Sequence, residues 1–172
     1  MLTPPVTARD HIQGPRDARI VLVEYGDYEC PYCGEAYSVI KELQRQLADQ
    51  LCFAFRNFPL ATAHPHAETA AEAAEAAGAQ GKFWEMHDIQ YENQAALEDE
   101  NLLEYASALG LSLPRFTRDL NEHIYAPRVR EDFRSGVRSG VNGTPGFFIN
   151  GAHYNGPYDV RSLFAALTAV AT

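Results

Sequence analysis

The sequence predicts an α/β protein in which two β-rich halves hold a helical block between them. Three observations indicate this class: a strand-like run at 20–25, a second run at 51–58 that follows a helical segment, and two short strands within 146–154 that follow the helical pattern of 65–140. A strand, a helix and a second strand in this order form a β-α-β unit with a right-handed crossover. We therefore expect a parallel or mixed sheet flanked by helices.

The first half begins with Ile20-Val-Leu-Val-Glu-Tyr25, which is apolar and β-branched apart from one glutamate. Such a run is typical of a strand buried on both faces of a sheet. A helical pattern covers 31–49, and Leu51 to Phe58 follows it as the second strand. The apolar residues that recur every three to four positions along that helix are Tyr37, Ile40, Leu43 and Leu47.

The middle and the end of the chain show further helices and a hairpin. Helical segments are expected from 65 to 78, where Gly78 and Gly81 break the pattern, and then at 81–91, 101–109, 114–123 and 126–137. Strand signals return at Gly146–Asn150, and Asn150-Gly151 predicts a tight turn into Ala152–Tyr154. Asp159 is expected to cap a closing helix.

Composition and charge restrict the class of protein. The chain has 172 residues, of which 46% are hydrophobic and 22% charged, as is ordinary for a globular domain. A formal net charge of −9 argues against nucleic acid as a partner. No segment approaches the length of a membrane span. The N-terminus lacks the apolar run of a signal peptide, so we expect a cytoplasmic protein; a trimmed extracytoplasmic protein, or a piece of a longer one, would show the same N-terminus.

The motif Cys30-Pro-Tyr-Cys33 stands between the first strand and the first helix. The orphan N–H groups and partial positive charge of a helix N-terminus favour the first cysteine as thiolate. Pro31 suits the first helical position, where a missing N–H costs nothing. We therefore predict dithiol–disulfide exchange, with Cys30 as a nucleophile exposed at the tip of the helix and Cys33 as the inward-facing resolving thiol.

A zinc site is the alternative for the two cysteines, because half of such a site has the same spacing. It would need two further ligands from candidates such as Cys52, His64 and His66, and none of these forms a second metal-binding pair in the sequence. We interpret Cys52 as a small buried strand residue and the two histidines as a helix cap and a surface group. No metal is expected.

The two motifs Val23-Glu-Tyr-Gly-Asp-Tyr-Glu-Cys-Pro-Tyr-Cys-Gly34 and Gly143-Thr-Pro-Gly-Phe-Phe-Ile-Asn-Gly151, with helices between them, resemble the DsbA-like thiol–disulfide oxidoreductases of the thioredoxin superfamily. The chain looks closest to a bacterial group that occurs as free-standing proteins and as tails fused to sodium/proton antiporters. The resemblance implies a thioredoxin-like core at 10–63 and 141–172 and an inserted all-helical domain at 64–140.

The resemblance also implies a substrate site around the cysteines. Pro145 matches the family's cis-proline, and Thr144 would offer backbone groups to an extended substrate. Pro31 and Tyr32 complete the predicted substrate-binding set. The redox pair would lie within the chain, so no external cofactor is expected. The expected partners are protein or peptide thiols and disulfides, with glutathione as a further candidate.

Glu24 and Tyr32 are the two positions that we expect to influence proton transfer from Cys33 and the pKa of Cys30. A buried Glu24 would have a raised pKa and could accept a proton from Cys33, as the acidic residue common at this position in relatives suggests; alternatively it points to solvent from a strand end. Strongly oxidising relatives carry a histidine where this chain has Tyr32. With Asp27 and Glu29 nearby, we expect a higher Cys30 pKa, and a more reducing protein, than in those relatives.

These observations predict a protein disulfide oxidoreductase that acts through a mixed disulfide. Two alternatives stay open. The chain could be a redox-sensing or docking module with little turnover, as in antiporter-fused relatives. It could also be an enzyme of this fold that uses glutathione as co-substrate, although such enzymes usually carry a serine or a single cysteine, and Cys33 argues against that reading.

Overall fold

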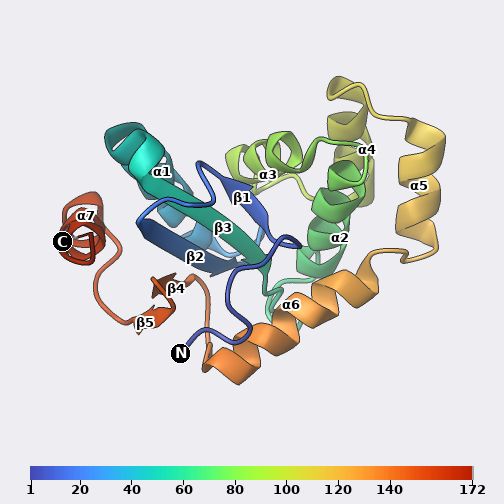
Figure 1. Ribbon diagram of the computed structural model, residues 1–172. Helices are drawn as coiled ribbons and strands as arrows, with labels where there is room; N and C mark the ends of the chain where they lie inside the picture. Colours follow the sequence, from blue (N-terminus) through green and yellow to red (C-terminus); the bar gives the residue numbers. More distant parts are fainter. Residues whose placement is uncertain (172) are drawn as a thin grey trace.

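A five-stranded mixed sheet forms the centre of the computed structural model, which describes residues 1–171 (Figure 1). The strands lie in the order β1-β3-β2-β4-β5. β2 and β3 are parallel, and the other neighbouring pairs are antiparallel. The strand bounds are β1 His11–Gln13, β2 Ile20–Gly26, β3 Leu51–Asn57, β4 Gly146–Ile149 and β5 Ala152–Tyr154. The predicted fold class, a mixed sheet flanked by helices, is confirmed.

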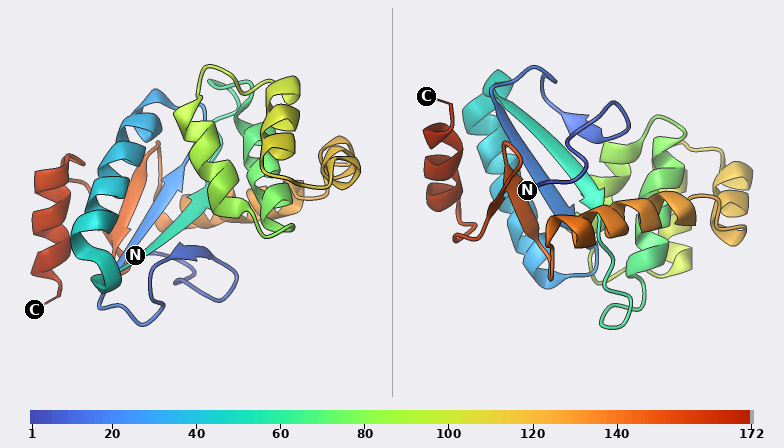
Figure 2. Two further views of the ribbon diagram at one scale, coloured as in Figure 1. Left: turned by 90° about the horizontal axis from the view of Figure 1, so that it is seen from above. Right: turned by 60° about the horizontal axis from the view of Figure 1, so that its bottom comes forward.

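The two faces of the sheet bury separate apolar clusters, because alternate residues of a strand point to opposite sides. Leu22 belongs to the cluster under α1 (Pro31–Leu47) and α7 (Val160–Ala169). Val23 belongs to the second cluster, under the N-terminal segment and α6 (Ala126–Ser139). α1 and α7 lie side by side in both views of Figure 2, on the same side of the sheet. Glu24 shares the face of Leu22 and therefore points toward α1.

The four helices between β3 and α6 gather with α6 beside the carboxyl ends of β2 and β3 (Figure 1). They are α2 Ala67–Gly78, α3 Phe83–Glu92, α4 Asp99–Ala108 and α5 Leu113–Asn121. α2 packs against α3, α4, α5 and α6. Its many buried alanines permit this, because small side chains let neighbouring helices approach closely. No helix within residues 1–171 is long and apolar enough to cross a membrane.

Local signals in the sequence predicted most elements, with one omission. The hairpin turns at Asn150 and Gly151, whose φ angles of 46° and 82° are those of a tight turn. Asp159 accepts a hydrogen bond from the Ser162 N–H at 3.0 Å and so caps α7 as expected. β1 was not predicted, because its three half-buried residues carry no run of apolar side chains and form a strand only by pairing with β3.

Candidate active site

Cys30 lies in the short connection between β2 and α1. It is the N-cap residue of α1, with extended backbone angles, and Pro31 is the first helical residue. The Cys30 carbonyl oxygen accepts hydrogen bonds from the N–H groups of Cys33 and Gly34, both at 3.1 Å. Cys33 therefore lies about one helical turn after Cys30 and faces the core, where it is fully buried. Both cysteines are free thiols in this structure.

The expectation that Cys30 is exposed at the tip of the helix was wrong. Only 3% of the residue is accessible to solvent. The segment before β4 covers it, and the Thr144 carbonyl oxygen lies 3.6 Å from the Cys30 sulfur. Tyr32 is instead the exposed residue of the motif, with 60% of its surface accessible. Cys30 is therefore a covered residue rather than one that projects from the tip of the helix.

Thr144 and Pro145 come to the cysteines because of how β4 pairs with β2. Gly146 pairs with Tyr25 in the antiparallel register, so the two residues before β4 lie beside the end of β2. The Thr144–Pro145 peptide bond is cis. The Thr144 Oγ1 atom is buried and has no hydrogen-bond partner within residues 1–171. It is therefore an available donor next to the Cys30 sulfur.

The pKa of the Cys30 thiol is lowered to about 5. The hydrogen bond with the Cys33 thiol lowers it most, and the Thr144 side chain and the N–H groups of Cys33 and Tyr32 lower it further, whereas burial acts in the opposite direction. The N–H groups belong to the first turn of α1, as the helix N-terminus argument predicted. Cys30 is thus a thiolate at neutral pH in the reduced protein.

The pKa values of Cys33 and Glu24 are raised, in contrast to the lowered pKa of Cys30. Burial raises the pKa of Cys33 well above its usual range, and the hydrogen bond to Cys30 and the charge of Glu24 add to the effect. Glu24 is 2% exposed, and burial together with the Cys30 charge raises its pKa to about 8. The alternative in which Glu24 points to solvent was wrong, because its side chain faces α1 rather than the sheet edge. Its Oε1 atom has no partner among the described residues.

Asp27 anchors the loop that follows β3 onto the cysteine turn. Its buried carboxylate accepts hydrogen bonds from the N–H of Glu29, the N–H of Leu60 and the Nδ1 of His64, each at 2.8 Å. The Glu29 carboxylate accepts the N–H of His66 at 2.7 Å. Asp27 and Glu29, whose negative charges we expected to raise the Cys30 pKa, therefore both accept hydrogen bonds from neighbouring residues.

The interpretation of His64 as a cap or a surface group was wrong. Its side chain is only 20% exposed and forms an ion pair with the fully buried side chain of Asp27. His66 is the residue at the N-cap position of α2, where its side chain makes no capping hydrogen bond. The sequence placed His64 beside a proline at the entrance to the helices, but nothing in it indicated a contact with a residue 37 positions earlier.

Gln94 is a second residue that sequence reasoning missed. It follows α3, and its Nε2 donates to the carbonyl oxygens of Tyr28 and Cys30, both at 2.9 Å. The helical block thus contacts the cysteine turn through Gln94. A single glutamine after a helix carries no sequence signal for this contact, because the two hydrogen-bonded residues are more than 60 positions apart.

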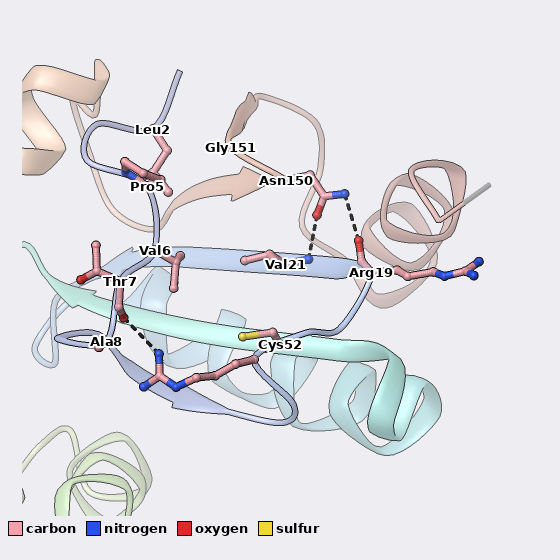
Figure 3. Close-up of a pocket in the computed structure, with 11 residues that line it drawn as sticks. Leu2, Pro5, Val6, Thr7, Ala8, Arg19, Val21, Cys52, Asn150 and Gly151 are labelled. Carbon is pink, nitrogen blue, oxygen red and sulfur yellow. Dashed lines mark hydrogen bonds between the residues drawn. The ribbon is translucent and has the colours of Figure 1, made fainter.

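Cys52 lies away from this site, at the start of β3, where it pairs with Val21. It is 1% exposed, as expected for a buried strand residue. It lines a cavity of about 590 Å³ between the sheet and the N-terminal segment (Figure 3). The cysteine pair follows the opposite, carboxyl end of the strands. Across residues 1–171, no group of three or more His, Cys, Asp or Glu side chains is arranged to hold a metal ion.

A family model described as thioredoxin matches residues 7–169 of the chain. Among curated proteins, a Na(+)/H(+) antiporter NhaA 1 of Salinispora arenicola (strain CNS-205) is 45% identical over 169 residues, which are 98% of this chain and 26% of the antiporter. The chain therefore spans about a quarter of the length of the curated relatives it matches.

Solved structures of similar fold cover almost the whole chain. Oxidised BdbD from Bacillus subtilis superposes with a TM-score of 0.84 at 22% identity, over 94% of this chain and 92% of that one. A thioredoxin-like oxidoreductase from Silicibacter pomeroyi DSS-3 has a TM-score of 0.81 at 25% identity, over 95% of this chain and 92% of that one.

Proposed function

The chain belongs to the thioredoxin family, and we propose that it is a thiol–disulfide oxidoreductase that exchanges a Cys30–Cys33 disulfide with protein or peptide thiols. The observation that carries the proposal is the contrast within the cysteine pair. Cys30 is stabilised as a thiolate at the N-terminus of α1, whereas its neighbour Cys33 is buried and held as a thiol. A stable thiolate is a good leaving group and a ready nucleophile.

In the oxidising direction, a substrate thiolate attacks the Cys30 sulfur of the Cys30–Cys33 disulfide. The substrate–Cys30 bond forms, the Cys30–Cys33 bond breaks, and the Cys33 sulfur leaves with the electron pair. A second substrate thiolate attacks the substrate sulfur of the mixed disulfide and releases Cys30 as a thiolate. The substrate dithiol is oxidised to a disulfide, and the cysteine pair is reduced. The reducing direction runs the same steps backwards.

Glu24 is the proposed proton carrier for Cys33. When Cys33 leaves as a thiolate in a buried site, a protonated Glu24 can return the proton, and in the reducing direction its carboxylate can remove it. A pKa of about 8 leaves Glu24 mostly protonated at neutral pH but able to ionise. The burial that raises the pKa of Cys33 also makes an internal proton carrier necessary.

We assign substrate contacts to Pro31 and Tyr32, which follow Cys30 in the chain, and to Thr144 and Pro145, which lie before β4 next to Cys30. An extended substrate would pair with the backbone at Thr144, and the exposed Tyr32 ring would offer it an apolar surface. The Thr144 carbonyl already lies within reach of the Cys30 sulfur. The redox pair is in the chain, so we propose no external cofactor.

The test is the redox equilibrium of the pair in glutathione buffers, read by alkylation and mass, with Cys52→Ser as the control variant. We expect the Cys30–Cys33 disulfide to form and break reversibly in both proteins. Cys33→Ser should accumulate a mixed disulfide with a cysteine-containing peptide, because Cys30 can attack but nothing resolves the product. Failure of the disulfide to form at any glutathione ratio would overturn the proposal. Peptide exchange that survives in Cys33→Ser at the full rate would point to glutathione transfer instead.

A redox-sensing or docking module is the second candidate function, favoured by the 45% identity to a protein named as an antiporter. In that case the disulfide would cycle without efficient turnover. Insulin reduction and the refolding of a scrambled ribonuclease, compared with the Cys30→Ser variant, separate the two functions. Turnover well above the variant supports the enzyme, and turnover equal to it supports the module.

A further inference from the structure

We propose that His64 is a positioning residue that neutralises the buried carboxylate of Asp27 at the start of the cysteine turn and thereby favours the Cys30 thiolate. The inference rests on the proposed function and deepens it, because it names a group outside the Cys-Pro-Tyr-Cys motif that controls the thiolate. The Cys-Pro-Tyr-Cys motif contains no cationic side chain, so a positive charge that acts on the thiolate comes from another part of the fold.

The geometry that supports this proposal is a chain of short contacts. The N–H of Cys30 donates to the Asp27 carbonyl oxygen at 3.1 Å, so Asp27 lies at the start of the same turn. Its side-chain Oδ2 accepts both the Leu60 N–H and the His64 Nδ1 at 2.8 Å. These bonds fix the loop after β3 against the turn and leave the imidazole ring at the edge of the site, 20% exposed.

The charges around His64 favour its protonated form. Burial alone would lower its pKa, but the hydrogen bond and charge of Asp27, together with the charges of Cys30 and Glu29, raise it. Cys30 is one of the charges that favour the protonated imidazole. The interaction is reciprocal, because a thiolate that favours imidazolium is itself favoured by it to the same extent.

Asp27 explains why the loop carries a histidine here rather than a neutral residue. The Asp27 side chain is fully buried, and as an unpaired carboxylate so near Cys30 it would oppose the thiolate. A protonated His64 cancels this charge, and it can do so without losing contact with solvent. The Asp27–His64 pair then carries no net charge, so the Asp27 carboxylate does not oppose the stabilisation of the thiolate by the N–H groups of α1.

The experiment uses His64→Asn, which preserves a donor near the Nδ1 position and removes the charge. His66→Asn is the matched control on the same loop, because within residues 1–171 no hydrogen bond or ion pair joins the His66 side chain to the cysteine turn, and its backbone bond to Glu29 is kept. The pH dependence of Cys30 alkylation by iodoacetamide, mapped by mass, reports the thiolate. Below the Cys30 pKa we expect the His64→Asn rate constant to be about threefold lower than that of wild type, which is about half a pKa unit. The disulfide should be favoured about threefold more in glutathione buffers.

A double variant tests the charge mechanism against a merely structural one. His64→Asn with Asp27→Asn has the same net charge at the site as wild type, so the alkylation profile and the redox equilibrium should return to wild type. A loop that is only disordered by the substitution would not be repaired by a second one. The proposal is overturned if His64→Asn equals His66→Asn in both measurements, or if the double variant is no closer to wild type than His64→Asn.

The two proposals fail in different ways. If the Cys30–Cys33 disulfide forms normally and the His64 variants match the control, only the role of His64 is lost. If no disulfide forms at any glutathione ratio, the proposed function is lost. The alkylation profile of Cys30 still measures the effect of His64 in that case, because it needs the thiol alone.

Discussion

At the scale of single residues, the two cysteine side chains of this site have different pKa values because their surroundings differ. Cys30 receives hydrogen bonds from the first turn of α1, and the pKa of its thiol falls to about 5. Cys33 lies about one turn further along the helix, where burial raises the pKa of its thiol. The difference follows from position, because only the N-cap residue faces the unpaired N–H groups. Position within the first helical turn therefore decides which of the two thiols is favoured as the thiolate.

Tyr32 lies between the two cysteines in the chain, so we expect a charge introduced at this position to act on the Cys30 thiolate. Tyr32→His would add a cation near the thiolate and stabilise the reduced form, so we expect the potential to rise by about 30 mV, which corresponds to about 1.4 kcal/mol for this couple. Equilibration with glutathione measures it. Tyr32→Phe, which changes no charge, should leave the potential where it is, and a potential of Tyr32→His at or below wild type would contradict the expectation.

Glu24→Gln should slow the step in which Cys33 exchanges its proton. General acid–base groups contribute about 10²-fold or more, so we expect mixed-disulfide resolution at pH 7 to slow by about this factor. Rapid acid quenching and mass analysis give the resolution rate. Glu104→Gln, on the exposed surface of α4, is the control. The attack of Cys30 on a peptide disulfide should change little, and equal slowing of both steps would argue against a proton carrier specific to Cys33.

At the scale of elements, the N-terminal segment is joined to the sheet through one buried arginine of β3. The Arg56 guanidinium donates to both oxygens of Asp10, at 2.7 and 3.1 Å, and to the Tyr25 hydroxyl at 2.9 Å. Its remaining donors reach the carbonyl oxygens of Pro4 and Pro5. All of its N–H groups are used, which is the condition under which a buried ion pair is tolerated.

Arg56→Met should therefore destabilise the protein strongly, because it leaves the Asp10 carboxylate buried without its partner. We expect a loss of about 3–5 kcal/mol in the free energy of unfolding, measured in urea. The control is Arg45→Met on α1, whose ion pair with Glu42 lies on the surface and should leave the unfolding curve unchanged. Adding Asp10→Asn to Arg56→Met should recover part of the loss, and a double variant no more stable than the single one would contradict the explanation.

At the scale of the whole molecule, the core beside the sheet contains the buried carboxyl group of Glu24. Glu24 occupies a core position in β2, on the face under α1, where its Oε1 has no partner among the described residues. Native proteins place such groups where function requires them, at a cost in stability. The pKa of about 8 expresses that cost, because the folded protein must keep a proton that the unfolded chain releases at neutral pH.

Glu24→Gln should stabilise the reduced protein at pH 7. The folded-state pKa of about 8 lies above the usual 4.5, so wild type loses stability as pH rises from about 4.5 toward 8, and the variant does not. We expect the variant to be more stable by about 1–3 kcal/mol at pH 7 in urea unfolding. At pH 4.5 or below the two proteins should unfold alike, and a difference of the same size at both pH values would show that repacking rather than ionisation is responsible.

The sequence by itself determined those features that depend on residues close together in the chain. The strand at 20–25, the helix that begins at Pro31, the hairpin at Asn150-Gly151 and the Asp159 cap are all specified by neighbouring residues, and the structure confirms them. The cysteine pair was predicted for the same reason, since its spacing and helical setting are local properties.

Only the tertiary structure decided what surrounds the cysteines. It showed that Cys30 is covered by the segment before β4, that Glu24 points into the core, and that His64 and Gln94 hold the cysteine turn. These contacts join residues 37 to 114 positions apart, brought together by the pairing of β2 with β3 and β4. Periodicity and spacing report which face of an element is buried, but not which distant side chain meets it there. The electrostatics of the thiolate depend on those distant side chains.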